Sequence, residues 1–208
     1  MERERIARVD LHSPRPSSAA VREMAEAART QYVLIQLTDN TVSLGYGAEQ
    51  RLLQVADSTG AVMVYADFYE TEEGQRTKHP VIDYQEGALR DDFDFGPLVL
   101  VRTDAILRCD LGGNWLYGGW YDLRLQLSRQ GAIFHVNEYL YTEEKQPVSA
   151  EGERQFDYVD PRNRDVQVEM EQIVTEHLRA VGGLVHTDRY QKPDVEGDFP
   201  VTASVIIP

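Results

Sequence analysis

Residues 62–102, VMVYADFYETEEGQRTKHPVIDYQEGALRDDFDFGPLVLVR, decide the fold of this chain. The segment opens on the apolar run 62–64 and closes on the apolar run 98–101, both typical of buried strands. The polar excursion between the two runs interleaves acidic and aromatic side chains. A loop of such length in a compact domain is usually functional or disordered, and aromatic residues argue against disorder. We therefore predict an ordered site loop held on a sheet.

The composition describes an acidic globular protein of 208 residues with a formal net charge of −14. A surface of that sign repels phosphate backbones and anionic membranes, which excludes nucleic acid polymers as partners. The single cysteine, Cys109, excludes an internal disulfide and indicates a reducing compartment. No apolar run reaches the length of a membrane span, and the start MERERIARVD lacks an apolar signal region. We expect a cytoplasmic protein, or the cytoplasmic part of a larger one.

The first part of the chain alternates between strand and helix patterns. Apolar runs predict strands at 5–11, 32–37 and 62–66. Helical spacing predicts one helix capped by Ser17 or Ser18 and a second over 48–59 that ends at Gly60. The segment 38–47 reads as a loop. This order predicts an α/β fold, with a Rossmann-like, mostly parallel (mixed) sheet flanked by helices.

The second part continues the same pattern. We expect a strand at 98–101, a short helix at 103–110, a glycine-rich loop, a helix at 121–130 and a long helix at 165–181. Two short strands are expected at 133–136 and 139–141. Residues 1–185 would form the domain and 186–200 a linker. The apolar end 201–208 is then the first strand of a following, truncated domain, or alternatively a strand that docks on this domain's own sheet.

Five segments, taken in chain order, carry a recognisable pattern: 17–40, 62–74, 94–106, 118–144 and 203–208. They include VMVYADFYETEEG, GGWYDLRLQLSRQGAIFHVNEYLYTEE and ASVIIP. Together they resemble family 2 glycosyltransferases, which are inverting nucleotide-sugar enzymes of the GT-A fold, especially versions from Bacteroides-type bacteria. The resemblance implies transfer of a sugar from a nucleotide-diphospho-sugar donor to a glycan or lipid-linked glycan acceptor. It also implies that residues 201–208 are the first strand of a following glycosyltransferase domain.

The chain departs from that family at its chemical positions. The family's first two strands, which carry the nucleotide-base pocket, have no counterpart before Arg5. The metal-binding Asp-x-Asp falls at 37–39, where only Asp39 is present. The Glu-Asp pair that carries the general base falls at Gly119 and Trp120, so both acids are missing. Asp122 matches a later aspartate of that motif, which makes it a candidate catalytic residue, or alternatively a structural one.

The candidate site residues follow from the needs of sugar transfer: a cation for the leaving diphosphate, a base and a donor pocket. Asp39 would bind Mg²⁺ or Mn²⁺, or is simply a turn aspartate. Asp67 would contact the donor, or caps its strand. In the acidic cluster 90–94, one of Asp91, Asp92 or Asp94 would serve as the base, with Asp92 the first choice, and Arg90 would meet a phosphate. Arg90, Asp91 and Asp94 are the candidate donor-binding residues of this cluster. The alternative is a structural network of these residues that fixes the loop.

The remaining candidates are aromatic and imidazole groups. Trp115 and Trp120 would present a sugar platform, or pack beneath the loop. His79 is expected to be a solvated loop histidine, while His135 and His177 are expected to be buried in the core.

Three functions stay open on the sequence. The first is family 2 sugar transfer, with single-sugar addition expected because the glutamine-arginine-tryptophan motif of processive synthases is missing. The second is a non-catalytic GT-A-like scaffold or acceptor-binding domain beside a catalytic domain. The third is a metal-dependent hydrolase built on Asp39, Asp67 and the cluster 90–94.

Overall fold

The computed structural model describes residues 5–145, 164–186 and 189. Most of the predicted linker at 186–200 and all of the predicted strand at 201–208 lie outside these residues, as does most of the charged segment that follows residue 143. The domain boundaries proposed from the sequence therefore stay predictions.

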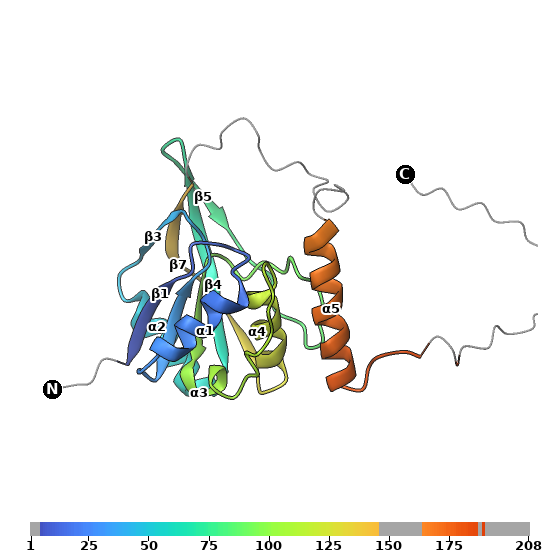
Figure 1. Cartoon of the computed structure of the whole chain (residues 1–208). Coiled ribbons are helices and arrows are strands. Elements are labelled where there is room, and N and C mark those ends of the chain that lie inside the picture. The colour runs from blue at the N-terminus through green and yellow to red at the C-terminus, as the bar shows by residue number, and fades with distance from the viewer. Residues whose placement is uncertain (1–4, 146–163, 187–188, 190–208) are drawn as a thin grey trace, which may run out of the picture.

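A seven-stranded sheet forms the centre of the molecule (Figure 1). Its strand order is β1-β2-β6-β4-β7-β3, with β5 paired to the outer half of β4. Strands β1, β2, β4 and β7 run in one direction, and β3, β5 and β6 run in the opposite one. The predicted α/β class with a mixed sheet flanked by helices is confirmed. The bounds of the strands are β1 (Ile6–Asp10), β2 (Tyr32–Gln36), β3 (Thr41–Leu44), β4 (Met63–Glu72), β5 (Gln75–His79), β6 (Leu98–Arg102) and β7 (Ile133–Glu144).

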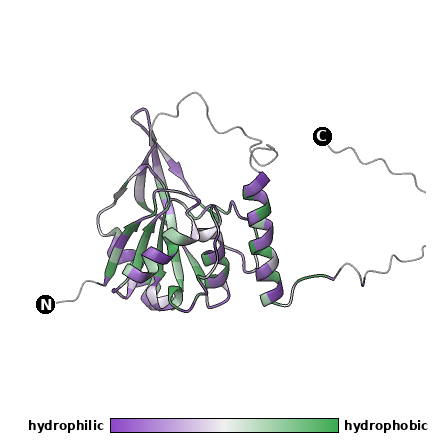
Figure 2. Cartoon of the chain, viewed as in Figure 1, coloured by the Kyte–Doolittle hydropathy of each residue, from purple (hydrophilic) through white to green (hydrophobic). Residues whose placement is uncertain are grey.

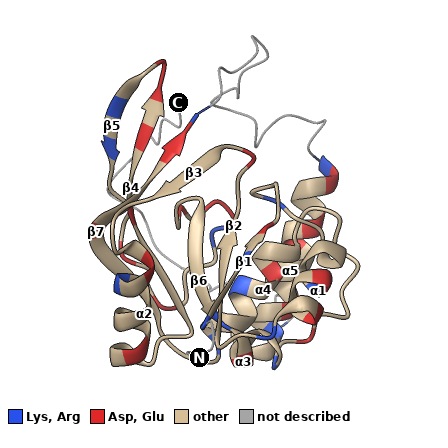
Figure 3. Cartoon of the chain, turned by 90° about the vertical axis from the view of Figure 1, so that its left-hand side faces the viewer, with Lys and Arg blue, Asp and Glu red and all other residues tan. Residues whose placement is uncertain are grey.

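The helices cover both faces of the sheet. Helix α2 (Ala48–Thr59) packs on β4 and β7, and Figure 3 shows it on the side of the sheet away from α1 and α4. Helix α1 (Ser18–Ala27) contacts α4 (Gly119–Ser128), and the short α3 (Thr103–Ile106) follows β6 directly. Helix α5 (Arg164–Ala180) packs on the outside of α4 (Figure 1). None of the described helices is long and apolar enough to cross a membrane.

Two capping residues predicted from the sequence lie at the expected helix ends, one at a start and one at a finish. Ser17 is the N-cap of α1, and its hydroxyl accepts a hydrogen bond from the backbone N–H of Ala20 at 3.3 Å. Gly60 closes α2 in the left-handed conformation, with φ of 68°.

The core lies where the central strands meet the helices. Val33, Ile35, Val99, Val101 and Met63 on β2, β6 and β4 are fully buried. Figure 2 shows the hydrophobic strands enclosed between more polar helices. Burial of each such side chain stabilises the fold by about 1.5–3 kcal/mol, so the sheet centre holds the loops above it rigidly.

Three elements differ from the sequence-based expectation. Strand β3 lies inside the predicted loop 38–47, because Val42 and Leu44 pack on the core while β3 pairs with β7. The two short strands predicted near 133–141 are one continuous strand, β7, which pairs with β4 across an irregularity at Asp67. Within the polar excursion, β4 and β5 form a hairpin with a Glu73-Gly74 turn, both at positive φ (49° and 81°).

Candidate functional site

Asp39 lies just beyond β2, on a turn that is firmly held. The hydroxyl of Thr38 and the side-chain amide of Asn40 both donate hydrogen bonds to Oε1 of Glu143 on β7, each at 2.9 Å. The carboxylate of Asp39 lies between them and points outward, with 74% of the side chain exposed. In the described part of the chain its ion-pair neighbour is His12, whose Nδ1 lies 3.9 Å from Oδ1.

This turn offers few metal ligands. Among residues 5–145, 164–186 and 189, no three or more His, Cys, Asp or Glu side chains are arranged to hold a metal ion. Proteins usually hold Mg²⁺ with one or two carboxylates, together with waters and the phosphates of a substrate. Asp39 would supply one carboxylate, and the described residues around it do not form a cation site on their own, so the metal role of Asp39 stays a prediction.

Asp67 is buried and bonded rather than open to a donor. Only 1% of its side chain is exposed. Its Oδ1 accepts hydrogen bonds from the backbone N–H of Val81 and from Nε2 of His135, both at 2.9 Å. The other ring nitrogen of His135, Nδ1, lies 2.7 Å from Oδ1 of Asp83 in the loop. Asp67 therefore fastens the loop to β4 and β7 through a first bridge, Asp67–His135–Asp83.

His79 forms a second bridge of the same kind. Its Nδ1 lies 2.9 Å from Oε1 of Glu70, and its Nε2 lies 2.8 Å from Oδ2 of Asp94. Its ring also stacks on Phe68, with the ring centroids 4.4 Å apart. The expectation of a solvated loop histidine is therefore wrong for His79, because stacking and two carboxylates hold it on the sheet. The histidine of the first bridge, His135, is buried with both ring nitrogens bonded, as expected.

A buried arginine on α4, which no sequence pattern marks, anchors the middle of the loop from below. Arg124 on α4 is 1% exposed, and burial lowers the pKa of its guanidinium. It donates from Nη1 to the carbonyl oxygen of Ala88 at 2.7 Å and from Nη2 to that of Arg90. The hydroxyl of Tyr121 donates to the carbonyl oxygen of Leu89. Three successive loop carbonyls are thus bound by α4.

The acidic cluster of the loop is internally paired. Arg90 donates from Nε and Nη2 to the two carboxylate oxygens of Asp92, each at 2.9 Å, while both side chains remain exposed. The hydrogen bond from Arg90 holds the pKa of Asp92 below its usual value, which weakens this carboxylate as a general base. Asp94 also accepts the backbone N–H of Gly96, so it turns toward the sheet, and Asp91 is exposed.

The start of α4, where the family has its Glu-Asp pair, has no room for acids. A Cβ on Gly119 would lie 2.4 Å from the backbone carbon of Ser17. Trp120 is 8% exposed and packs edge-on against Phe95, with the ring centroids 6.5 Å apart. A side chain at 119 would clash, and the side chain at 120 belongs to the core.

Helix α5 covers the same helix end. The carboxylate of Glu169 accepts hydrogen bonds from the backbone N–H groups of Leu116, Tyr117 and Gly118 at 2.9, 2.7 and 2.7 Å. A Cβ on Gly118 would lie 2.1 Å from Cδ1 of Ile173. A carboxylate of α5 thus satisfies three successive backbone donors of the turn that leads into α4, including the N-cap Gly118.

The remaining candidates, Trp115 and Asp122, take part in the packing between α4 and α5. Trp115 donates from Nε1 to Oδ2 of Asp122 at 3.2 Å and packs against α5. Asp122 also accepts from the amide of Gln126 at 3.1 Å, and burial raises the pKa of its carboxyl. Trp120 is buried and Trp115 is half-buried against α5, so both contribute to packing, and their role as a sugar platform stays a prediction.

The structure brings the predicted residues into two groups. Arg90, Asp91, Asp92 and Asp94 lie on the loop that Asp67 fastens to the sheet. Trp115, Trp120 and Asp122 lie at the covered start of α4. Asp39 stands apart on the turn after β2. The residues that sequence reasoning passed over are Arg124 and Glu169, and no local signal marks either.

No protein-family model matches the chain, and no curated protein matches it. Among solved structures, the chain is similar to residues 1–349 of S. aureus TarS, solved in complex with UDP-GlcNAc. The two share 12% sequence identity with a TM-score of 0.45, over 80% of this chain and 52% of that one. The chain thus spans about half the length of that structure.

Proposed function

We propose that this domain is a glycosyltransferase-like module that takes part in sugar transfer as a scaffold or acceptor-binding partner, and does not itself perform the chemical step. The resemblance of five ordered segments to family 2 glycosyltransferases supports the connection with sugar transfer. The closed first turn of α4 supports the non-catalytic role, and it is the observation that carries the proposal.

Sugar transfer needs a general base beside the acceptor hydroxyl, and the start of α4 offers no place for one. At Gly119 a side chain would meet the backbone of Ser17 at 2.4 Å, and Trp120 is committed to the core. Among the candidate bases of the loop, Asp92 is held by two hydrogen bonds from Arg90, which lower its pKa, and Asp94 is bonded to His79 and to the backbone N–H of Gly96. A base must accept a proton from the acceptor hydroxyl, and each of these positions is unsuited to that task.

A second candidate function is sugar transfer by this domain itself, using a nucleotide-sugar donor, a glycan acceptor and addition of a single sugar. The observation in its favour is Asp39, which is 74% exposed at the end of β2, where the resemblance places the second metal-binding aspartate. The described residues around Asp39 do not form a cation site on their own, so we propose no step through a metal. The hydrolase has less support, because Asp67 is buried in the first bridge.

Calorimetric titration with UDP and with GDP, each with and without Mn²⁺, tests the proposal. We expect no metal-dependent saturation, while circular dichroism shows that the protein is folded. The variant Asp39→Ala should behave as the parent does, and so should the control Glu26→Ala, an exposed carboxylate on α1 outside every candidate site. Metal-dependent binding that Asp39→Ala abolishes and Glu26→Ala retains would overturn the proposal in favour of a donor site in this domain.

A further inference from the structure

Helix α5 lies along the outside of α4 (Figure 1) and is held there through one small apolar cluster. The cluster consists of Met170 and Ile173 on α5 and Tyr121 and Leu125 on α4, all buried and separate from the main core. The only other buried side chain in the described part of α5 is His177. A helix that buries so few side chains belongs to the part of a fold that opens at a low free-energy cost. We therefore expect α5 to leave α4 more readily than the sheet unfolds.

Departure of α5 from α4 leaves the polar groups of this contact open to water. Glu169 accepts hydrogen bonds from the backbone N–H groups of Leu116 and Tyr117 at 2.9 and 2.7 Å, and both of these residues are exposed. Water can therefore replace the carboxylate at these donors. Nδ1 of His177 is buried and makes no hydrogen bond among the described residues, so solvation satisfies it. The docked and undocked states of α5 thus differ mainly in the apolar contacts of the cluster.

Tyr121 joins this cluster to the loop that follows β5. Its ring packs against α5, and its hydroxyl donates a hydrogen bond to the carbonyl oxygen of Leu89. The guanidinium of Arg124 lies over the same ring, 5.0 Å from its centroid, and Nη1 of Arg124 donates to the carbonyl oxygen of Ala88 at 2.7 Å. The attraction between a guanidinium and an aromatic ring depends on the position of the ring. One ring thus supports both groups of α4 that hold the middle of the loop.

The two ends of the loop are fastened to the sheet. The backbone N–H of Val81 donates to Oδ1 of Asp67 on β4 at 2.9 Å. The backbone N–H of Gly96 donates to Oδ1 of Asp94 at 2.8 Å, and Asp94 is bonded in turn to His79 on β5. These carboxylates belong to the sheet and to the loop itself, so a movement of α5 acts on the middle of the loop and spares its ends.

We propose that the docking of α5 on α4 controls the order of residues 88–90 in the loop, and that Tyr121 transmits the effect. While α5 is docked, Met170 and Ile173 fix the ring of Tyr121, so its hydroxyl stays on the loop carbonyl. When α5 leaves, the ring loses these contacts and water competes for the hydroxyl, which loosens the loop between its fastened ends. Because coupling between two equilibria is reciprocal, a loosened loop also weakens the docking of α5. The proposal does not rest on the proposed function, because it concerns how the loop is held and not what the loop binds.

Amide hydrogen exchange of the whole chain, followed by NMR, tests the coupling. The variant is Ile173→Ala, which removes most of a side chain on α5 that is 1% exposed and packs on α4. We expect exchange to accelerate at least about tenfold along α5 and at the N–H of Ala88, because a large-to-small change weakens the packing of the cluster. In the parent this N–H is bonded to the carbonyl oxygen of Gln85 at 2.9 Å. The amides of Val81 and Gly96 should keep their parent rates within about twofold.

The matched control is Val168→Ala, a substitution of an exposed β-branched residue of α5 that lies outside the cluster. All exchange rates in this control should match those of the parent. Faster exchange along α5 with unchanged exchange at Ala88 would overturn the proposal, because α5 would then leave without affecting the loop. Unchanged exchange along α5 in Ile173→Ala would also overturn it, since the cluster would not be what holds the helix. Equal acceleration at Ala88, Val81 and Gly96 would show general destabilisation in place of the proposed coupling.

Tyr121→Phe tests the route of the coupling. This variant keeps the ring against α5 but removes the hydroxyl that binds the carbonyl oxygen of Leu89, so α5 should stay protected while Ala88 exchanges faster. Adding Ile173→Ala to Tyr121→Phe should then accelerate exchange at Ala88 by a smaller factor than it does in the parent, because the bond that it would release is already gone. An equal factor in the two backgrounds would remove the hydroxyl of Tyr121 from the route and contradict the role proposed for it.

Discussion

Gly119, the first residue of α4, packs directly against the backbone of Ser17, the N-cap of α1. A Cβ at Gly119 would stand 2.4 Å from the carbonyl carbon and 2.5 Å from the next backbone nitrogen. Backbone atoms on a capped helix cannot give way as a flexible side chain does. The close approach of α1 to α4 therefore depends on a missing side chain, at the very position where the resembled family carries an acid.

Gly119→Ala should destabilise the fold by about 1–3 kcal/mol, because the added methyl overpacks a backbone contact. The measurement is urea unfolding followed by circular dichroism. The control is Gly183→Ala, since a Cβ there meets Leu178 at an ordinary 3.4 Å. This control should change stability by no more than about 0.5 kcal/mol. Equal effects at the two glycines would mean that α1 and α4 can separate at little cost.

The first bridge predicts unequal effects from its two carboxylates. Asp67→Ala should cost about 2–4 kcal/mol, because it leaves the N–H of Val81 and the Nε2 of His135 buried without their acceptor. Asp83→Ala removes a side chain that is 89% exposed, and should cost less than about 1 kcal/mol. Thermal and urea unfolding of both variants would test this order. A larger loss in Asp83→Ala would contradict the assigned roles.

Acidic pH should weaken the docking of α5. Burial lowers the pKa of His177, with Arg129 and Arg124 acting in the same direction. Because the folded pKa lies below the unfolded value of about 6.5, the unfolded chain binds more protons once the pH falls through that value. The stability contribution is therefore complete above about pH 6.5 and is lost as the pH decreases below it.

The His177 effect can be isolated with His177→Leu, which packs at the same position but does not titrate. The urea midpoint of the parent should fall between pH 7.5 and pH 5.5 by more than that of the variant. Parallel changes in the two proteins would assign the acid sensitivity to other groups.

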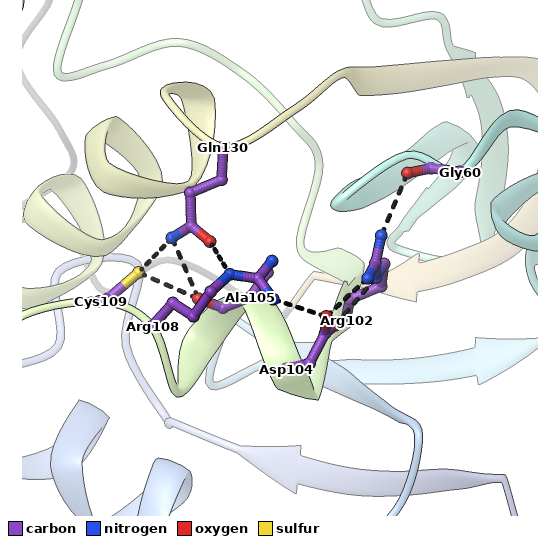
Figure 4. Close-up of polar contacts among 7 residues, drawn as sticks. All are labelled: Gly60, Arg102, Asp104, Ala105, Arg108, Cys109 and Gln130. Atoms are coloured by element: carbon purple, nitrogen blue, oxygen red, sulfur yellow. Dashed lines mark hydrogen bonds and ion pairs between the residues drawn. The ribbon is translucent and has the colours of Figure 1, made fainter.

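Cys109 should react slowly while the protein is folded. Burial raises the pKa of its thiol to about 11, and its Sγ accepts a hydrogen bond from Gln130 (Figure 4). At pH 8 a group with that pKa is ionised in roughly one molecule in a thousand, and only the thiolate is a good nucleophile. Labelling with iodoacetamide at pH 8 should therefore be much slower in buffer than in 6 M urea, if urea unfolds the chain. Equal rates would show that the thiol is accessible in the fold.

The central strands could be predicted from sequence because their signal is local. The runs at β2, β6 and the start of β4 are continuously apolar, which is what strands buried on both faces require. Strand β3 was not predicted from the sequence, because it has four residues in which polar and apolar side chains alternate, and threonine, serine and glycine are typical of loops. Its formation depends on β7, a partner roughly a hundred residues away in the chain, and no window on the sequence includes both.

The site was harder to predict than the fold for the same reason. The turn at Asp39 and the acidic cluster at 90–94 stand out in the sequence, and both lie on the loops where the pattern places them. The roles of His79, His135 and Arg124 depend on which strand or helix lies under the loop. An arginine in a helix pattern is usually exposed, so the burial of Arg124 beneath three loop carbonyls follows from packing and not from its neighbours in sequence.

The second bridge has a consequence for how the molecule opens. His79 ends β5 and ties Glu70 on β4 to Asp94 near the far end of the loop. We therefore expect the hairpin and the distant end of the loop to open in a coupled way, because His79 joins them. A change at the hairpin turn should alter the protection against hydrogen exchange near Gly96, whose N–H is bonded to Asp94.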